Sequence, residues 1–205
     1  MHESLRGHPF LPQSGHGPGV LVLVSGARAE ALARDAGIRL AHHGFVAWAP
    51  ELPAAAGDSP SEEERRAVDA GIERLFCEHG VEGARVGMIG FGRGGLLALD
   101  AAARGARVAS VVALDAGFAP GSLDGSLARI DAFVMAVFAE KGPGVARIDA
   151  AELERRLREE QIACDLRTQP GVGDGFLDPA QPDRYDANAA RACWDAALAR
   201  LRAEL

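Results

Sequence analysis

Short apolar runs alternate with segments of helical spacing along most of the chain. The predicted strands are residues 20–24, 45–49, 85–89, 108–114, 133–139 and 164–168. The predicted helices are residues 29–42, 61–79, 95–104, 149–161 and 186–204. Because strands separated by helices form right-handed βαβ crossovers, this order predicts an α/β fold with about six mainly parallel strands and helices on both faces.

Two local patterns support these assignments. Ser61 and Glu64 have the spacing of a capping box, in which each side chain satisfies a backbone amide at the start of a helix. Residues 108–114 are almost continuously apolar, as expected for a strand covered on both faces. Residues 1–18 show no periodicity and are expected to form an irregular N-terminal arm, followed by a single domain over residues 19–205.

Composition narrows the class of function. The chain has 205 residues and a formal net charge of −7, so attraction to a phosphate backbone is not expected. No apolar run approaches the roughly 20 residues of a membrane span, and no leader peptide is recognisable. The widely spaced Cys77, Cys164 and Cys193 suit no zinc motif and favour a reducing cytoplasm. We expect no binding to nucleic acid, to a membrane or to a cofactor, and the sequence does not determine the oligomeric state.

A glycine-rich turn follows the third predicted strand and allows two interpretations. Gly90, Gly92 and Gly95 match G-x-G-x-x-G, and Asp115 follows Gly95 by 20 residues, as in a dinucleotide fingerprint. Two strands and two helices precede the motif, however, whereas the fingerprint normally opens its domain. Gly90–Gly94 also has the form G-x-Nuc-x-G of a nucleophile elbow, a sharp turn between a strand and a helix.

Several stretches together resemble the dienelactone hydrolase family of the α/β-hydrolase fold. They are residues 43–52, the turn and following helix at 90–98, and residues 138–142, 170–176 and 185–194. The resemblance runs from about Gly19 to Leu205. It implies a triad of nucleophile, Asp and His, in which the nucleophile attacks a lactone or ester carbonyl and the His moves the proton.

All three triad positions carry other residues in this sequence. The nucleophile position is Gly92, the acid position is Gly142 and the histidine position is Asp174, while Ser25 stands where such enzymes carry a Glu. All six histidines lie before residue 80, so no histidine follows the turn. We therefore expect no acyl-enzyme chemistry of the family type.

Polar groups still follow the predicted strands, where ligands bind in such sheets. The pocket candidates are Ser25, Arg28, Glu51, Phe91, Arg93, Asp115 and Glu140. One interpretation is a non-catalytic protein that binds or responds to a small molecule. A second is a repurposed hydrolase, isomerase or lyase acting on a lactone or carbonyl compound, with Asp115 and Asp174 as acid and base. The third is dinucleotide binding at Gly90–Gly95.

Overall fold

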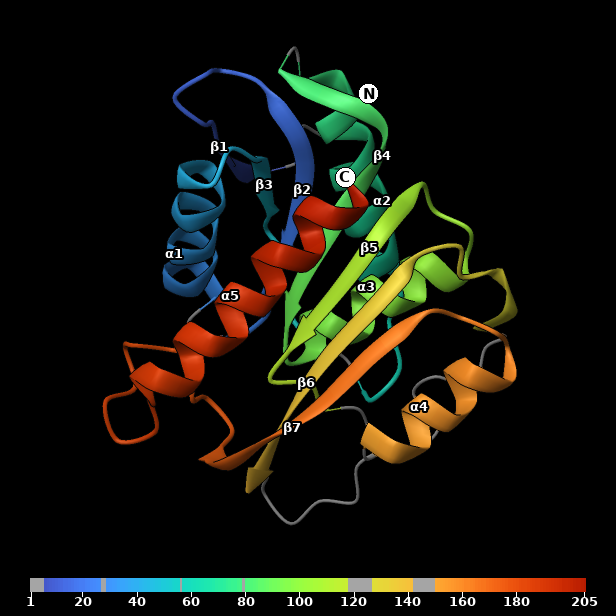
Figure 1. Cartoon of the computed structure of the whole chain (residues 1–205). Helices are drawn as coiled ribbons and strands as arrows, with labels where there is room; N and C mark the ends of the chain where they lie inside the picture. Colours follow the sequence, from blue (N-terminus) through green and yellow to red (C-terminus); the bar gives the residue numbers. More distant parts are fainter. Residues whose placement is uncertain (1–5, 27–28, 56, 79, 118–126, 142–149) are drawn as a thin grey trace.

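A mostly parallel seven-stranded sheet forms the centre of the molecule in the computed structural model (Figure 1). The structure describes residues 6–26, 29–55, 57–78, 80–117, 127–141 and 150–205. The strands are β1 (Gly7–Phe10), β2 (Gly17–Leu23), β3 (Val46–Pro50), β4 (Val81–Phe91), β5 (Val108–Leu114), β6 (Phe133–Lys141) and β7 (Cys164–Gly173). Their order across the sheet is β1-β3-β2-β4-β5-β6-β7, and only β1 runs antiparallel to its neighbour.

Helices cover both faces of the sheet. They are α1 (Ala29–His42), α2 (Glu62–Cys77), α3 (Arg93–Ala103), α4 (Ala150–Glu159) and α5 (Ala187–Glu204), with a short 3₁₀ helix at Leu127–Arg129. Figure 1 shows α5 crossing in front of the sheet and α3 behind it. One apolar core packs beneath α2, α3 and α4, and a second packs beneath α1 and α5. No helix in the described ranges is long and apolar enough to cross a membrane.

The central strands supply both cores by alternation. In β2, Leu21 and Leu23 point into the core beneath α2 and α3, whereas Val20 and Val22 point into the core beneath α1 and α5. All four side chains are fully buried, as the period of two along a covered strand requires. The α/β fold, the parallel sheet and the helices on both faces are confirmed.

Several elements have the bounds that the local pattern predicted. The helix at 29–42 and the strand at 108–114 agree at both ends. The capping box at the start of α2 is also confirmed, because Glu64 N donates to Ser61 Oγ at 3.2 Å and Ser61 N donates to Glu64 Oε2 at 2.8 Å. The predicted helix over 61–79 ends two residues early, at Cys77.

The N-terminal segment differs from the expected irregular arm. Residues 7–10 form β1, which pairs with β3 so that Gly7 lies opposite Pro50, and β2 already begins at Gly17. The sequence of β1 has no alternation that would predict a strand. The free edge of β3 supplies the partner, and a proline is tolerated in β1 because an edge strand pairs on one side only.

Candidate functional site

The turn between β4 and α3 is the sharpest feature at the carboxyl edge of the sheet. Gly92 joins the two elements with φ 53° and ψ −116°, a backbone conformation that side-chain-bearing residues rarely adopt. Gly92 N donates to Leu114 O in β5 at 2.9 Å, and Gly95 N donates to Gly92 O at 3.0 Å. The turn is therefore tied to the neighbouring strand and to its own helix.

Close backbone approach explains the other glycines of the turn. A Cβ built on Gly94 would lie 1.9 Å from the carbonyl oxygen of Leu23 in β2. A Cβ on Gly90 would lie 2.2 Å from the carbonyl group of Gly94, and one on Gly95 would lie 2.7 Å from Cβ of Ala113. These glycines let α3 pack directly onto β2, β4 and β5, which accounts for the pattern without a bound phosphate.

Gly92 is different, because a Cβ at this position would face open space. The nearest atom outside its chain neighbours is the Asp115 carbonyl oxygen, at 4.0 Å. The turn thus has the geometry of a nucleophile elbow, with room for a side chain at the position where this sequence has none.

Arg93, the first residue of α3, is held by a dense set of hydrogen bonds. Its Nε and Nη2 donate to the two carboxylate oxygens of Glu64 at 2.6 and 2.8 Å. Its remaining donors bind carbonyl oxygens of residues 57–59, at 2.8 to 3.2 Å. Glu64 is fully buried, and the hydrogen bonds from Arg93 hold the pKa of its carboxyl group below the ordinary value. Arg93 therefore anchors the start of α2 to the elbow.

Asp115 links the end of β5 to the loop after β7. Its φ of 53° is in the left-handed region, and its Oδ2 accepts a hydrogen bond from Gly175 N at 2.7 Å. Asp174 precedes that glycine and lines a cavity of about 500 Å³ together with Lys141 and residues 183–186. Asp115 is not among the described residues that line this cavity, although its hydrogen-bond partner Gly175 directly follows Asp174.

Replacing Asp115 tests this link. Asp115→Ala should lower the free energy of unfolding by about 2–3 kcal/mol, because Gly175 N loses its acceptor and alanine tolerates positive φ poorly. Asp115→Asn keeps an oxygen acceptor and tolerates the left-handed region, so its loss should stay below about 1 kcal/mol. Urea unfolding followed by circular dichroism measures both values. Equal losses for the two variants would show that the hydrogen bond contributes little.

The remaining pocket candidates are spread over several surroundings. Phe91 is buried, with its ring centroid 5.9 Å from that of Trp194, and so it belongs to the core beneath α5. Glu140 accepts a hydrogen bond from Gly171 N at 2.8 Å and thereby holds the β7 backbone. Ser25 is half-buried just after β2.

Glu51 is exposed after β3 and lines a cavity of about 310 Å³ that includes His8, Gly26 and Glu30. Among the residues that the structure describes, Glu51 lines this cavity and Asp174 lines the cavity of about 500 Å³. Arg28 and Gly142 lie outside the described residues. Within the ranges that the structure describes, no three His, Cys, Asp or Glu side chains are grouped as a metal site would require.

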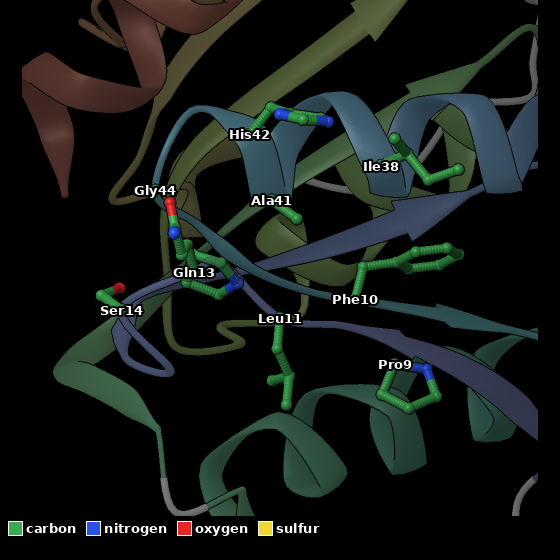
Figure 2. A pocket seen from close by; sticks show the side chains of 10 residues that line it. Pro9, Phe10, Leu11, Gln13, Ser14, Ile38, Ala41, His42 and Gly44 are labelled. Atoms are coloured by element: carbon green, nitrogen blue, oxygen red, sulfur yellow. The ribbon is translucent and has the colours of Figure 1, made fainter.

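A shallow groove lies away from the elbow, at the β1 edge of the sheet. Figure 2 shows Ile38 and Ala41 of α1 on one side of it and residues 9–14 on the other. Its volume is about 750 Å³, and Leu11 and Ile38 are exposed within it. None of the sequence-predicted site residues that the structure describes is among the residues lining this groove.

Comparison with known proteins decides the family. The model of the dienelactone hydrolase family matches residues 5–205. The chain belongs to the dienelactone hydrolase family. No curated protein matches the sequence.

Solved structures agree with this assignment at the level of the fold. A dienelactone hydrolase-like promiscuous phosphotriesterase, P91, from metagenomic libraries has a TM-score of 0.76 and 24% identity, over 94% of this chain and 88% of that one. A candidate dienelactone hydrolase from Klebsiella pneumoniae has a TM-score of 0.75 and 22% identity, over 94% and 90%. The carboxylesterase Cest-2923 from Lactobacillus plantarum has a TM-score of 0.70 and 13% identity, over 94% and 92%.

Sequence reasoning missed one residue that shapes the elbow of this dienelactone hydrolase family member. Glu64 was recognised as part of a capping box, but nothing in the sequence links it to Arg93, 29 residues later. The only available signal was an acidic residue four positions before Val68, on the face of α2 whose later residues are buried. Such a residue requires a buried cationic partner, although the pattern does not say which.

Proposed function

We propose that this dienelactone hydrolase family member does not perform acyl-enzyme hydrolysis and acts as a small-molecule binding or regulatory protein. The observation that carries the proposal is Gly92. The elbow turn places this residue in the conformation and open surroundings of a nucleophile, yet glycine has no atom that can attack a carbonyl.

The other triad positions support the same proposal. Asp174 stands at the histidine position, and a carboxylate there does not replace an imidazole that shuttles a proton at neutral pH. The sequence has no histidine after His79 that could take this role from the carboxyl side of the elbow. The match to the family model covers residues 5–205, and a fold of this kind can bind a ligand without catalysing a reaction.

The enzymatic alternative and the dinucleotide-binding alternative have weaker support. An acid–base pair of Asp115 and Asp174 would need both carboxylates to face one substrate, whereas Asp115 Oδ2 is bonded to Gly175 N. Dinucleotide binding would need free amides at the turn, whereas Gly92 N is bonded to Leu114 O. The glycines at 90, 94 and 95 have a packing role that requires no pyrophosphate.

Hydrolysis of an activated aryl ester and of a dienelactone tests the proposal. We expect the purified protein and Asp174→Asn to show no turnover above the buffer rate. Gly92→Cys serves as the positive control, because the open space above this position should let the introduced thiol attack the ester and release the aryl alcohol. Peptide mass spectrometry should then find an acyl group at position 92 of Gly92→Cys, beyond any slow acylation of the exposed Cys77 that both proteins share.

Two results would overturn the proposal. Turnover by the wild type that Asp174→Asn abolishes would show that the carboxylates have taken over the chemistry. Rapid acylation of the wild type at a residue other than the exposed Cys77 would show a nucleophile elsewhere in the chain. If NAD(P) shifted the melting temperature and no lactone did so, the dinucleotide alternative would instead be favoured.

A further inference from the structure

A further cavity lies on the sheet face that α1 and α5 cover. It has a volume of about 370 Å³, which is within the range of small-molecule sites. Its walls come from α1, the loop before α5 and the first turns of α5, which are neighbours on this face (Figure 1). The polar and aromatic side chains that line it are Asp35, Arg39, Tyr185, Asn188, Arg191 and Trp194.

Arg39 is held in place by an aromatic ring, not by a close carboxylate. Its guanidinium carbon lies 4.8 Å from the centroid of the Trp194 ring, a cation–π geometry. Trp194 is almost fully buried, so this support is rigid. The only carboxylate near Arg39 in the described residues is Asp35, at 3.7 Å, which is longer than a hydrogen bond. The Arg39 side chain is 40% exposed, so its outer donors can reach a ligand.

Arg191 brings a second guanidinium to the same cavity. Its Nη2 donates to Asn188 Oδ1 at 3.0 Å, and the described part of the chain offers it no ion pair. This differs from Arg65, Arg93 and Arg104, which each make hydrogen bonds with carboxylates. Two arginines against one aspartate leave the cavity with positive charge, in a chain whose formal net charge is −7.

Two backbone amides in the first turn of α5 are already hydrogen-bonded and are not available to a ligand in the cavity. Asp186 caps the helix, and its Oδ1 accepts from Asn188 N and Ala189 N at 3.0 and 2.9 Å. Anion recognition therefore falls to the two guanidinium groups, which suit the planar, two-oxygen geometry of a carboxylate. Leu177, Pro179 and the half-exposed Tyr185 ring supply an apolar wall beside them.

We propose that this cavity is a binding site for a small organic carboxylate with a planar apolar body. The carboxylate bridges Arg39 and Arg191 and displaces the distant contact of Arg39 with Asp35. The apolar body lies against Leu177, Pro179 and Tyr185. Gly92 is not among the described residues that line this cavity, although Tyr185 also lines the cavity beside Asp174. The proposal does not depend on whether the chain has hydrolytic activity.

Titration with benzoate at low ionic strength tests the site, with benzamide as the uncharged analogue of the same shape. We expect saturable benzoate binding by isothermal titration calorimetry, at least tenfold tighter than benzamide. Arg39→Gln and Arg191→Gln should each weaken benzoate binding tenfold or more. Arg34→Gln is the matched control, because Arg34 is an exposed residue of α1 that does not line the cavity, and it should bind as the wild type does.

Further variants and probes separate binding from folding. Arg39→Lys keeps a positive charge near Trp194 but loses the two-pronged geometry, so it should fold normally and still bind benzoate more weakly than the wild type. Thermal unfolding checks each variant. No saturable benzoate binding, or binding that all three cavity variants leave unchanged, would overturn the proposal. Tighter binding of inorganic phosphate than of benzoate would overturn the role of the apolar wall. Acylation of Gly92→Cys by the aryl ester should be unchanged when Arg39→Gln or Arg191→Gln is added, which distinguishes this site from the elbow.

Discussion

Gly94→Ala is expected to destabilise the protein by more than about 3 kcal/mol or to prevent folding. Alanine has the higher helix propensity, so on local grounds the substitution in α3 would be stabilising by about 1 kcal/mol. The tertiary contact reverses this sign, because the new Cβ would lie 1.9 Å from the Leu23 carbonyl oxygen. That oxygen belongs to the backbone of β2 at the centre of the sheet and cannot rotate away.

Gly92→Ala is the matched control for this prediction. It lies two residues away in the same turn, but its Cβ would have no neighbour closer than 4.0 Å. Its loss of stability should come from the positive φ alone, about 1–2 kcal/mol. Urea unfolding of both variants measures the difference. The interpretation would be wrong if Gly94→Ala were as stable as Gly92→Ala.

Glu64→Gln is expected to lower the free energy of unfolding by about 3–5 kcal/mol, because it removes the charge that compensates Arg93 in a buried ion pair. The guanidinium edge formed by Nε and Nη2 of Arg93 would then lack a carboxylate, and the capping box at Ser61 would be weakened. Glu63→Gln, on the exposed side of the same first turn, should change stability by less than about 0.5 kcal/mol.

The double variant Glu64→Gln/Arg93→Gln separates the ion pair from simple packing. If the two side chains act as a pair, its loss of stability should be clearly smaller than the sum of the two single losses. Additive losses would show that Glu64 and Arg93 contribute independently.

The same pair gives a pH dependence with a defined sign. The pKa of Glu64 is lower in the folded protein than its ordinary value, mainly because Arg93 donates hydrogen bonds to it. Its contribution to stability is therefore fully present above the ordinary carboxyl pKa and is lost as pH falls through the lower folded-state pKa. Unfolding measured from pH 7 downward should show the wild type and Glu64→Gln converging in acid. A constant difference across this range would contradict the assignment.

Local patterns were sufficient where an element depends on its own neighbours in sequence. The helix at 29–42 follows from the spacing of Leu32, Ala36 and Leu40, and its bounds agree with the structure. The continuous apolar run at 108–114 likewise predicted β5 at both ends. By contrast, β1 has no pattern of its own and depends on the edge of β3, so the sequence did not predict it.

The candidate site shows the same division. The sequence located the elbow, and the structure supplies the turn conformation at Gly92. The sequence also placed Arg93 and Phe91 among the pocket candidates because they follow a central strand. In the structure, Arg93 is bonded to Glu64 and Phe91 packs against Trp194. Position after a strand identifies the edge of the sheet where a side chain lies, but it does not say which partner the side chain meets.

The α/β class, most helices and strands, and the side chain at each position, including a glycine at 92 and an aspartate at 174, follow from the amino-acid sequence. That Arg93 contacts Glu64, and that Arg39 and Arg191 line one cavity, follows only from the folded arrangement of the elements. The two kinds of feature differ in how far apart in the sequence the interacting residues lie. Helix and strand patterns arise between residues a few positions apart, whereas these contacts depend on the order of strands in the sheet and on the face to which each helix packs.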